Sequence, residues 1–218
     1  MPEFFREATP SEPAVRGFLH EAGSTTGLVI THSAGSNCNS PLLTSLAEAL
    51  AARGITVLRC DLPFRQARPY GPPLGTAEKD QAGLRRAVHT LREVVSGRIF
   101  LGGHSYGGRV GSMLAAQESS LAEGLLLLSY PLHPPRKPQQ LRTAHFPNLE
   151  APALFVHGTR DPFGSVEEMK SALTLVPART QLLAIEGAGH ELVGKSNRQP
   201  TIDSITQTLL DWCASADS

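Results

Sequence analysis

The sequence predicts an α/β fold, in which a mostly parallel sheet carries helices on both faces. Short apolar runs rich in Val, Ile and Leu alternate along the chain with segments whose apolar residues recur at helical spacing. The runs are continuous, as in residues 124–128, which is typical of strands buried on both faces. The 20 glycines and 17 prolines fall mostly between these segments, where they end one element before the next begins.

The size and charge of the chain limit its organisation and its partners. A length of 218 residues is typical of one domain, so we expect a single domain over 1–218 with an irregular, proline-rich lead-in over 1–14. Lys plus Arg and Asp plus Glu number 20 each, which disfavours nucleic acid or an anionic membrane as partner. The chain start lacks the apolar run of a secretory signal, so we expect a cytoplasmic protein. Nothing in the sequence indicates the oligomeric state.

The cysteines argue against both a disulfide framework and a metal site. They are few, odd in number and widely spaced: Cys38, Cys60 and Cys213. We therefore predict reduced thiols, no metal and no cofactor.

The first elements follow the lead-in. An edge strand is expected over 15–20, and a β-rich central strand over 28–31. Ser40 can cap the helix that comes next, Pro41 suits the first turn of that helix, and a glycine ends it. Residues 55–60 then form another buried strand.

The middle of the chain repeats this alternation. Residues 61–75 are rich in Pro and Arg and predict a loop, and residues 76–95 predict an amphipathic helix. A buried strand over 98–103 leads into a helix that ends near residue 117. The run 124–128 is the next buried strand.

The last third begins with a proline-rich segment, 129–152, which we expect to be a loop too polar for the core and lying across a site. A strand over 153–157 follows. Ser165 and Glu168 form a capping box for the next helix, and a strand is expected over 181–185. A closing amphipathic helix is indicated by apolar residues at helical spacing: Ile202, Ile205, Leu209 and Trp212.

The pattern Gly103-x-Ser105-x-Gly107 lies where a buried strand meets the start of a helix. Small residues two before and two after a nucleophile let strand and helix approach closely, and the turn holds the serine out of the sheet. Ser105 is therefore the candidate nucleophile. The alternative is a serine that only shapes the turn.

A serine hydroxyl needs a base to activate it and a third group to orient that base. Asp161 and His190 each lie in a loop directly after a predicted strand, and the chain order Ser, Asp, His is the one known for α/β-hydrolases. His190 would take the proton of Ser105, and Asp161 would hold the imidazole in place. Asp161 could instead brace its own turn or cap the helix that follows.

The tetrahedral intermediate of acyl transfer needs backbone N–H donors. One is expected from Tyr106, directly after the nucleophile. The second is expected from Ser33 or Ala34, in the loop that follows the first central strand. The two loops that flank the predicted site carry cations that could orient an anionic group of the substrate or stay solvated: Arg65, Arg68, Arg136, Lys137 and Arg142. Arg65 and Arg136 are the first candidates among them.

Three stretches carry a resemblance to a known family: 102–108, 129–135 and 154–164. With them the chain resembles the α/β-hydrolases over residues 25–212, in particular the small, cap-poor branch that includes dienelactone-hydrolase-like proteins. It is also similar to the hydrolase-like domain shared by a testis-expressed family and a regulatory subunit of the NSL histone acetyltransferase complex. The resemblance implies an eight-stranded sheet with an antiparallel second strand and little or no cap. Dienelactone hydrolases use a cysteine where this chain has Ser105.

These observations predict a serine hydrolase that cleaves a small carboxyl ester or thioester through an acyl-enzyme on Ser105. The expected partner is a small-molecule acyl substrate. The predicted strands are not separated by a long insertion, which argues against a large lid over the site. Two alternatives stay open: a binding or scaffold module that has lost efficient turnover, and a peptidase or carbon–carbon bond hydrolase, which can use the same three residues.

Overall fold

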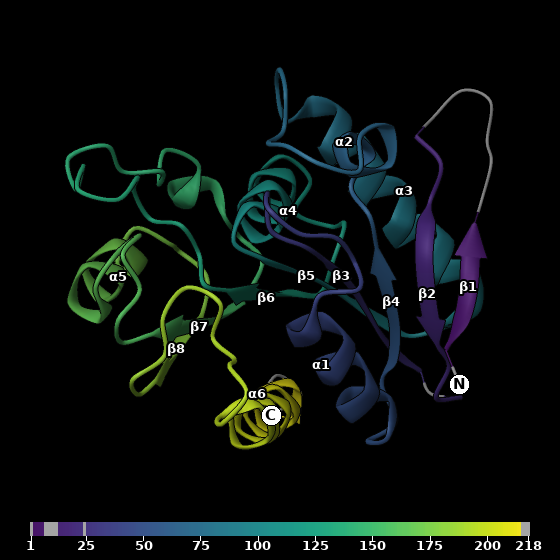
Figure 1. Ribbon diagram of the computed structural model, residues 1–218. Coiled ribbons are helices and arrows are strands. Elements are labelled where there is room, and N and C mark those ends of the chain that lie inside the picture. The colour runs from purple at the N-terminus through teal and green to yellow at the C-terminus, as the bar shows by residue number, and fades with distance from the viewer. Residues whose placement is uncertain (1, 7–12, 24, 215–218) are drawn as a thin grey trace.

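Eight strands form one sheet in the order β1-β2-β4-β3-β5-β6-β7-β8 in the computed structural model, which describes residues 2–6, 13–23 and 25–214 (Figure 1). Strand β2 runs antiparallel to both of its neighbours, and all other neighbouring strands are parallel. The predicted α/β-hydrolase sheet is thus confirmed, including its antiparallel second strand. The strands are β1 (Glu3–Arg6), β2 (Arg16–His20), β3 (Thr26–Thr31), β4 (Thr56–Cys60), β5 (Arg98–His104), β6 (Gly124–Leu128), β7 (Ala153–Gly158) and β8 (Thr180–Ile185).

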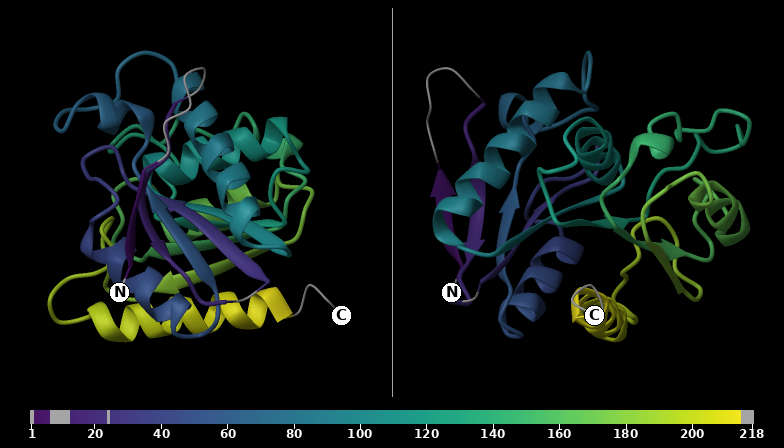
Figure 2. Two further views of the ribbon diagram at one scale, coloured as in Figure 1. Left: turned by 90° about the vertical axis from the view of Figure 1, so that its right-hand side faces the viewer. Right: turned by 180° about the vertical axis from the view of Figure 1, so that it is seen from behind.

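Helices cover both faces of this sheet (Figures 1 and 2). Helices α1 and α6 pack on one face, and α3, α4 and α5 pack on the other, so that two apolar clusters lie on opposite sides of the strands. The helices are α1 (Pro41–Ala51), α2 (Pro63–Ala67), α3 (Glu78–Val94), α4 (Tyr106–Gln117), α5 (Val166–Leu173) and α6 (Arg198–Ala214), with a 3-10 turn η1 (Phe146–Asn148).

Local sequence signals explain where these elements begin. The central strands are continuous apolar runs, and every residue of β6 is buried. Ser40 accepts a hydrogen bond from the N–H of Leu43 and caps α1, with proline in the first turn. Ser165 and Glu168 form the predicted capping box of α5. These caps satisfy N–H groups that have no partner inside the helix.

Two segments expected to be irregular contain regular structure. Within the lead-in over 1–14, residues 3–6 form β1, where Phe4 packs edge-on against Phe18 at 5.6 Å between ring centroids. A four-residue strand is too short for alternation to reveal it, and pairing with β2 stabilises it instead. Residues 7–12 of the lead-in lie outside the described residues. In the segment 61–75, the short helix α2 begins at a proline.

The segment 129–152 is not too polar for the core, contrary to the prediction. Tyr130, Leu132, Phe146 and Leu149 are fully buried in it. The ring of Tyr130 lies 5.3 Å from that of Phe146 and 6.0 Å from that of Phe155 on β7. The segment is therefore anchored by an aromatic cluster, although its prolines prevent any periodic pattern.

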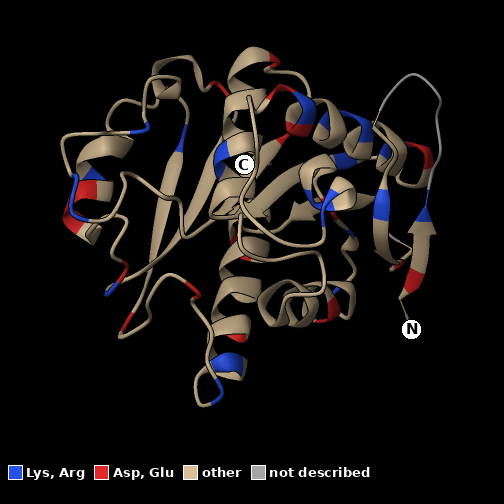
Figure 3. Ribbon diagram, turned by 45° about the horizontal axis from the view of Figure 1, so that its top comes forward, with Lys and Arg blue, Asp and Glu red and all other residues tan. Residues whose placement is uncertain are grey.

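Figure 3 shows that Lys and Arg residues (blue) are interspersed with Asp and Glu residues (red) along the ribbon. Within the described residues, no helix is both long enough and apolar enough to cross a bilayer.

Strands β3, β5, β7 and β8 are parallel and end at the same edge of the sheet. The loops that leave this edge carry the candidate site residues.

Candidate active site

Ser105 lies on the sharp turn between β5 and α4, with φ 53° and ψ −113°. Positive φ is strained for a residue with a side chain. The flanking glycines permit the turn: a Cβ added at Gly103 would lie 2.5 Å from the carbonyl carbon of Gly107. A Cβ added at Gly107 would lie 2.6 Å from the carbonyl oxygen of His32. Helix α4 therefore approaches both β5 and the end of β3 so closely that only glycine fits at the two positions.

Ser105, His190 and Asp161 form a continuous chain of hydrogen bonds. The Nε2 atom of His190 lies 2.8 Å from Oγ of Ser105, and its Nδ1 atom lies 2.8 Å from Oδ2 of Asp161. The carboxylate only accepts hydrogen bonds, so Nδ1 carries the proton and Nε2 accepts from the serine hydroxyl. The structure brings together the three residues that the sequence singled out as nucleophile, acid and base.

The loop after β7 fixes the carboxylate of Asp161. Its Oδ1 atom accepts the N–H of Phe163 at 2.9 Å, and its side chain is fully buried. Asp161 thus braces its own turn and also contacts the imidazole, so the two interpretations of this residue are compatible. A Cβ added at Gly158 would lie 2.4 Å from the carbonyl oxygen of Ala188, which shows how tightly the loops after β7 and β8 pack together.

Two aromatic residues that the sequence did not indicate hold the ring of His190. The ring of Phe163 lies 4.2 Å away, between centroids, and that of His104 lies 5.5 Å away. Burial lowers the pKa of His104, so this ring is neutral and donates its Nε2–H to the carbonyl oxygen of His190 at 2.9 Å. In the sequence, the only indication that His104 belongs to the site is its position directly before Ser105.

The residues expected to supply the backbone donors border the same space as the serine or follow it directly. Ser33 and Ala34 line a cavity of about 370 Å³ together with Ser105 and His190. Tyr106 is the first residue of α4, so its N–H has no acceptor within the helix. The residues named from the sequence as donors thus lie near the nucleophile, and their role in binding an oxyanion stays a prediction.

The two arginines predicted to orient a substrate lie elsewhere. Arg65 is buried, and its guanidinium donates to the carbonyl oxygens of Ala34 (2.7 Å), Ser36 (2.7 Å) and Gly71 (3.1 Å). It therefore braces the loop that carries the second expected backbone donor. Arg136 is exposed and lines neither of the cavities that border Ser105.

His32 braces the other side of the same loop. It is fully buried, its Nδ1–H donates to the carbonyl oxygen of Ser33 at 2.8 Å, and its Nε2 accepts the N–H of Leu62 at 3.1 Å. Both contacts together require a neutral ring, because a protonated ring has no acceptor. Burial lowers the pKa of His32 to about 4.

The protein is expected to lose stability as the pH falls from 6.5 toward 4. The unfolded chain, in which histidine has its ordinary pKa of 6.5, binds a proton at His32 in this range before the folded chain does. The shift corresponds to about 3 kcal/mol of unfolding free energy, fully present above pH 6.5. Urea unfolding midpoints measured from pH 8 to pH 5 check this.

His32→Gln should weaken this pH dependence without abolishing it, because burial also lowers the pKa of His20, His104 and His145. His89→Gln, which changes an exposed histidine, should leave it intact. An unfolding midpoint that stays constant between pH 7 and pH 5 would contradict the prediction.

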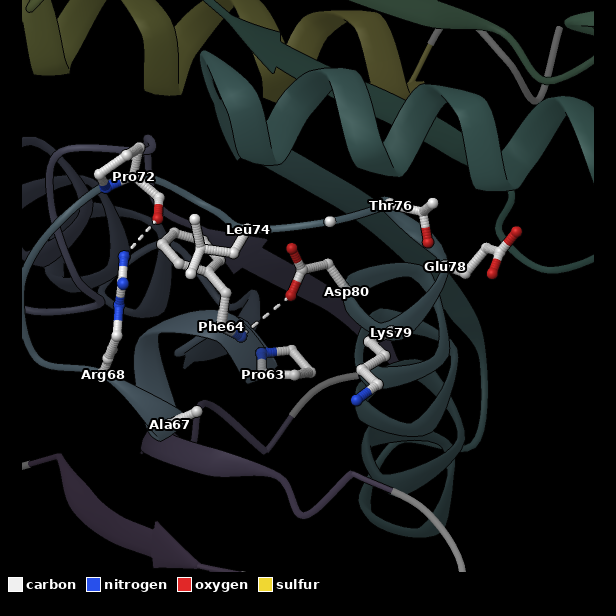
Figure 4. Close-up of a pocket in the computed structure, with 11 residues that line it drawn as sticks. Pro63, Phe64, Ala67, Arg68, Pro72, Leu74, Thr76, Glu78, Lys79 and Asp80 are labelled. Atoms are coloured by element: carbon white, nitrogen blue, oxygen red, sulfur yellow. Dashed lines mark hydrogen bonds between the residues drawn. The ribbon is translucent and has the colours of Figure 1, made fainter.

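A polar network under Tyr106 ties the start of α4 to α3. The hydroxyl of Tyr106 donates to Oδ2 of Asp80 at 2.8 Å. The N–H of Phe64 donates to Oδ1 of the same carboxylate at 3.1 Å (Figure 4). Burial raises the pKa of Asp80, and these two donors oppose the rise. The carboxylate borders a separate cavity of about 370 Å³, whose apolar wall includes Phe64 and Leu74.

All three cysteines are free and buried, which confirms the prediction of reduced thiols. Burial raises the pKa of Cys38 to about 12, so this thiol stays protonated at neutral pH. Cys38 is therefore no competitor of Ser105 as a nucleophile.

Comparison with known proteins agrees with this architecture. Residues 24–216 match the model of a family described as an alpha/beta hydrolase domain. A dienelactone hydrolase from Anabaena variabilis superposes with a TM-score of 0.76 at 19% identity, over 97% of this chain and 96% of that one. Est1E from Butyrivibrio proteoclasticus gives 0.76 at 16% identity, over 97% and 99%.

A serine hydrolase without a lid from Xanthomonas campestris gives a TM-score of 0.73 at 16% identity, over 97% of this chain and 94% of that one. At these identities the likeness establishes a shared fold. The family match spans nearly the whole chain, and the recognition made from the sequence is confirmed. The chain belongs to the alpha/beta hydrolase domain family.

Proposed function

We propose that this protein is a serine hydrolase that cleaves a small carboxyl ester or thioester through an acyl-enzyme on Ser105. The observation that carries the proposal is the chain of 2.8 Å hydrogen bonds from Ser105 through His190 to Asp161, mounted on a strained strand-to-helix turn. A serine that only shaped the turn would need neither partner.

The chemistry follows from the contacts. As Oγ of Ser105 attacks the carbonyl carbon, its proton passes to Nε2 of His190, and the carboxylate of Asp161 stabilises the imidazolium that forms. The N–H groups of Tyr106 and of Ser33 or Ala34 would bind the oxyanion. His190 then protonates the leaving alkoxide or thiolate. In the second half of the reaction, His190 takes a proton from a water molecule, which attacks the acyl carbon. Oγ of Ser105 is then the leaving group and receives that proton from His190.

The space around the serine favours small substrates. Besides the cavity at Ser33, a second cavity of about 410 Å³ borders Ser105 and Tyr106, and Ala34 and Phe163 line both. Both volumes are in the range of small-molecule sites. The structural neighbours include proteins named as esterase and serine hydrolase, and one of them is described as lacking a lid.

Active-site labelling and turnover test the proposal together. The purified protein should react with a fluorophosphonate probe, mass spectrometry should find the adduct on the peptide containing Ser105, and acetyl to hexanoyl 4-nitrophenyl esters should be hydrolysed. A protein that takes up no probe and cleaves no ester would be a binding or scaffold module instead. Labelling of Ser105 combined with cleavage of peptides but not esters would favour the peptidase.

A further inference from the structure

Two arginines face the cavity of about 410 Å³ that borders Ser105. Arg109 lies on α4 one turn after the serine, and its N–H donates to the carbonyl oxygen of Ser105 at 2.9 Å. Arg142 reaches the same cavity from the segment between β6 and β7. None of the described residues that line this cavity is acidic.

The guanidinium of Arg109 lacks a partner. Its Nε atom is buried without a hydrogen bond, and no carboxylate pairs with this side chain in the described part of the chain. Leaving a buried donor of a charged group unpaired is costly, so such a group ordinarily has a partner in the functional state of a protein. An acceptor supplied by a ligand would satisfy it.

Hydrogen bonds of its backbone N–H and C=O groups hold Arg142 in place. Its N–H donates to the carbonyl oxygen of Leu132 at 2.8 Å, and its own carbonyl accepts the hydroxyl of the buried Tyr130. Its guanidinium makes one long contact, Nη1 to the carbonyl oxygen of Pro131 at 3.3 Å. Most of the donors of Arg142 therefore stay available on a rigid support.

The two cations also act on each other. Burial and the nearby Arg109 guanidinium both lower the pKa of Arg142. The two positively charged guanidinium groups beside this cavity repel each other, and an anion bound between them would reduce the repulsion. Guanidinium groups match the geometry of a carboxylate, which each can bind through two parallel N–H donors.

We infer that Arg109 and Arg142 form a subsite that binds a carboxylate carried by the substrate whose acyl bond Ser105 attacks. This inference rests on the proposed function. Of the loop cations named from the sequence it keeps Arg142 in the orienting role, and it adds Arg109, which lines the same cavity as the nucleophile. The substrate class is then an acidic ester or thioester, such as a half-ester of a dicarboxylic acid.

Matched substrates test the subsite. The mono-4-nitrophenyl esters of succinic, glutaric and adipic acid are compared with 4-nitrophenyl butanoate, pentanoate and hexanoate, which have equal chain lengths but no charge. A second pair, 4-acetoxybenzoate and 4-acetoxybenzamide, places the charge on the leaving group instead. The wild type should prefer the charged member in at least one pair. Arg109→Gln and Arg142→Gln should each lower that preference, measured as a ratio of kcat/KM, by about 10- to 100-fold.

Lys137→Gln is the matched control, because it removes one positive charge from an exposed position in the same segment as Arg142. It should leave the preference unchanged. If Lys137→Gln and Arg142→Gln lowered the preference for charged esters equally, the preference would depend only on the overall positive charge of the segment. That result would overturn the subsite. Equal kcat/KM for charged and neutral esters in every pair would overturn it as well.

Binding separates this inference from the proposed function. Calorimetric titration of Ser105→Ala with glutarate should show binding that Arg109→Gln weakens in the same background and Lys137→Gln does not. If the wild type cleaves no ester but this binding pattern holds, the hydrolase proposal fails and the anion subsite stands. If neutral esters are cleaved but glutarate binding is absent or independent of Arg109, the subsite alone fails.

Discussion

Ser105→Ala is expected to lower kcat for 4-nitrophenyl esters by about 10⁴- to 10⁶-fold, because it removes the atom that forms the acyl-enzyme. The fold should survive. Alanine keeps the same Cβ on the strained turn, and the single hydrogen bond lost to His190 contributes about 1 kcal/mol. Initial rates, together with urea unfolding of the same samples, check both parts of the prediction.

The double variant Ser105→Ala with His190→Ala should be no slower than Ser105→Ala alone, since the two residues act as one unit. Turnover at the wild-type rate in Ser105→Ala would show that the reaction does not pass through this residue.

Ser112 provides a control on the same helix, because its Oγ also lies 2.8 Å from a histidine nitrogen, Nε2 of His145. Here the polarity is reversed: the hydroxyl of Ser112 donates to the carbonyl oxygen of Arg109 at 2.9 Å, so the histidine must donate to the serine. His145 therefore cannot take the proton. Ser112→Ala should retain ester turnover.

The positions of the central strands and the three hydrogen-bonded residues could be predicted because each leaves a local signal, whereas the antiparallel second strand was expected only from the family resemblance. Ser105 lies within a glycine motif, and Asp161 and His190 each follow directly on an apolar run. In a parallel sheet all such positions fall on one edge, so the fold itself brings them together. No long-range information was needed.

The charged surroundings of the nucleophile could not be predicted in the same way. Arg65, Arg136 and Arg142 were named because their loops flank the site, yet the path of a long side chain decides where its charge lies. Arg65 turns inward onto several backbone carbonyl oxygens, and Arg136 stays exposed. In the sequence, Arg109 looks like any polar helix residue, and the direction of Arg142 depends on contacts within an aperiodic segment.

Gly103→Ala is expected to lower the free energy of unfolding by at least about 3 kcal/mol, or to prevent folding, because overpacking against backbone atoms cannot be relieved by side-chain movement. The added methyl group would lie 2.5 Å from the carbonyl carbon of Gly107 and 2.5 Å from the nitrogen of Gly108. Urea unfolding and the yield of soluble protein measure this effect.

Gly111→Ala, on the helix α4 that follows the turn, is the matched substitution. Its methyl group would meet the Cγ atom of Leu101 at 3.5 Å, an ordinary van der Waals contact, so the higher helix propensity of alanine should stabilise the protein by about 0.5 to 1 kcal/mol. If Gly103→Ala unfolded at the same urea concentration as the wild type, β5 and α4 could separate without cost. The strained turn would then not be what positions Ser105 beside His190, and close packing would not explain the glycines of the motif.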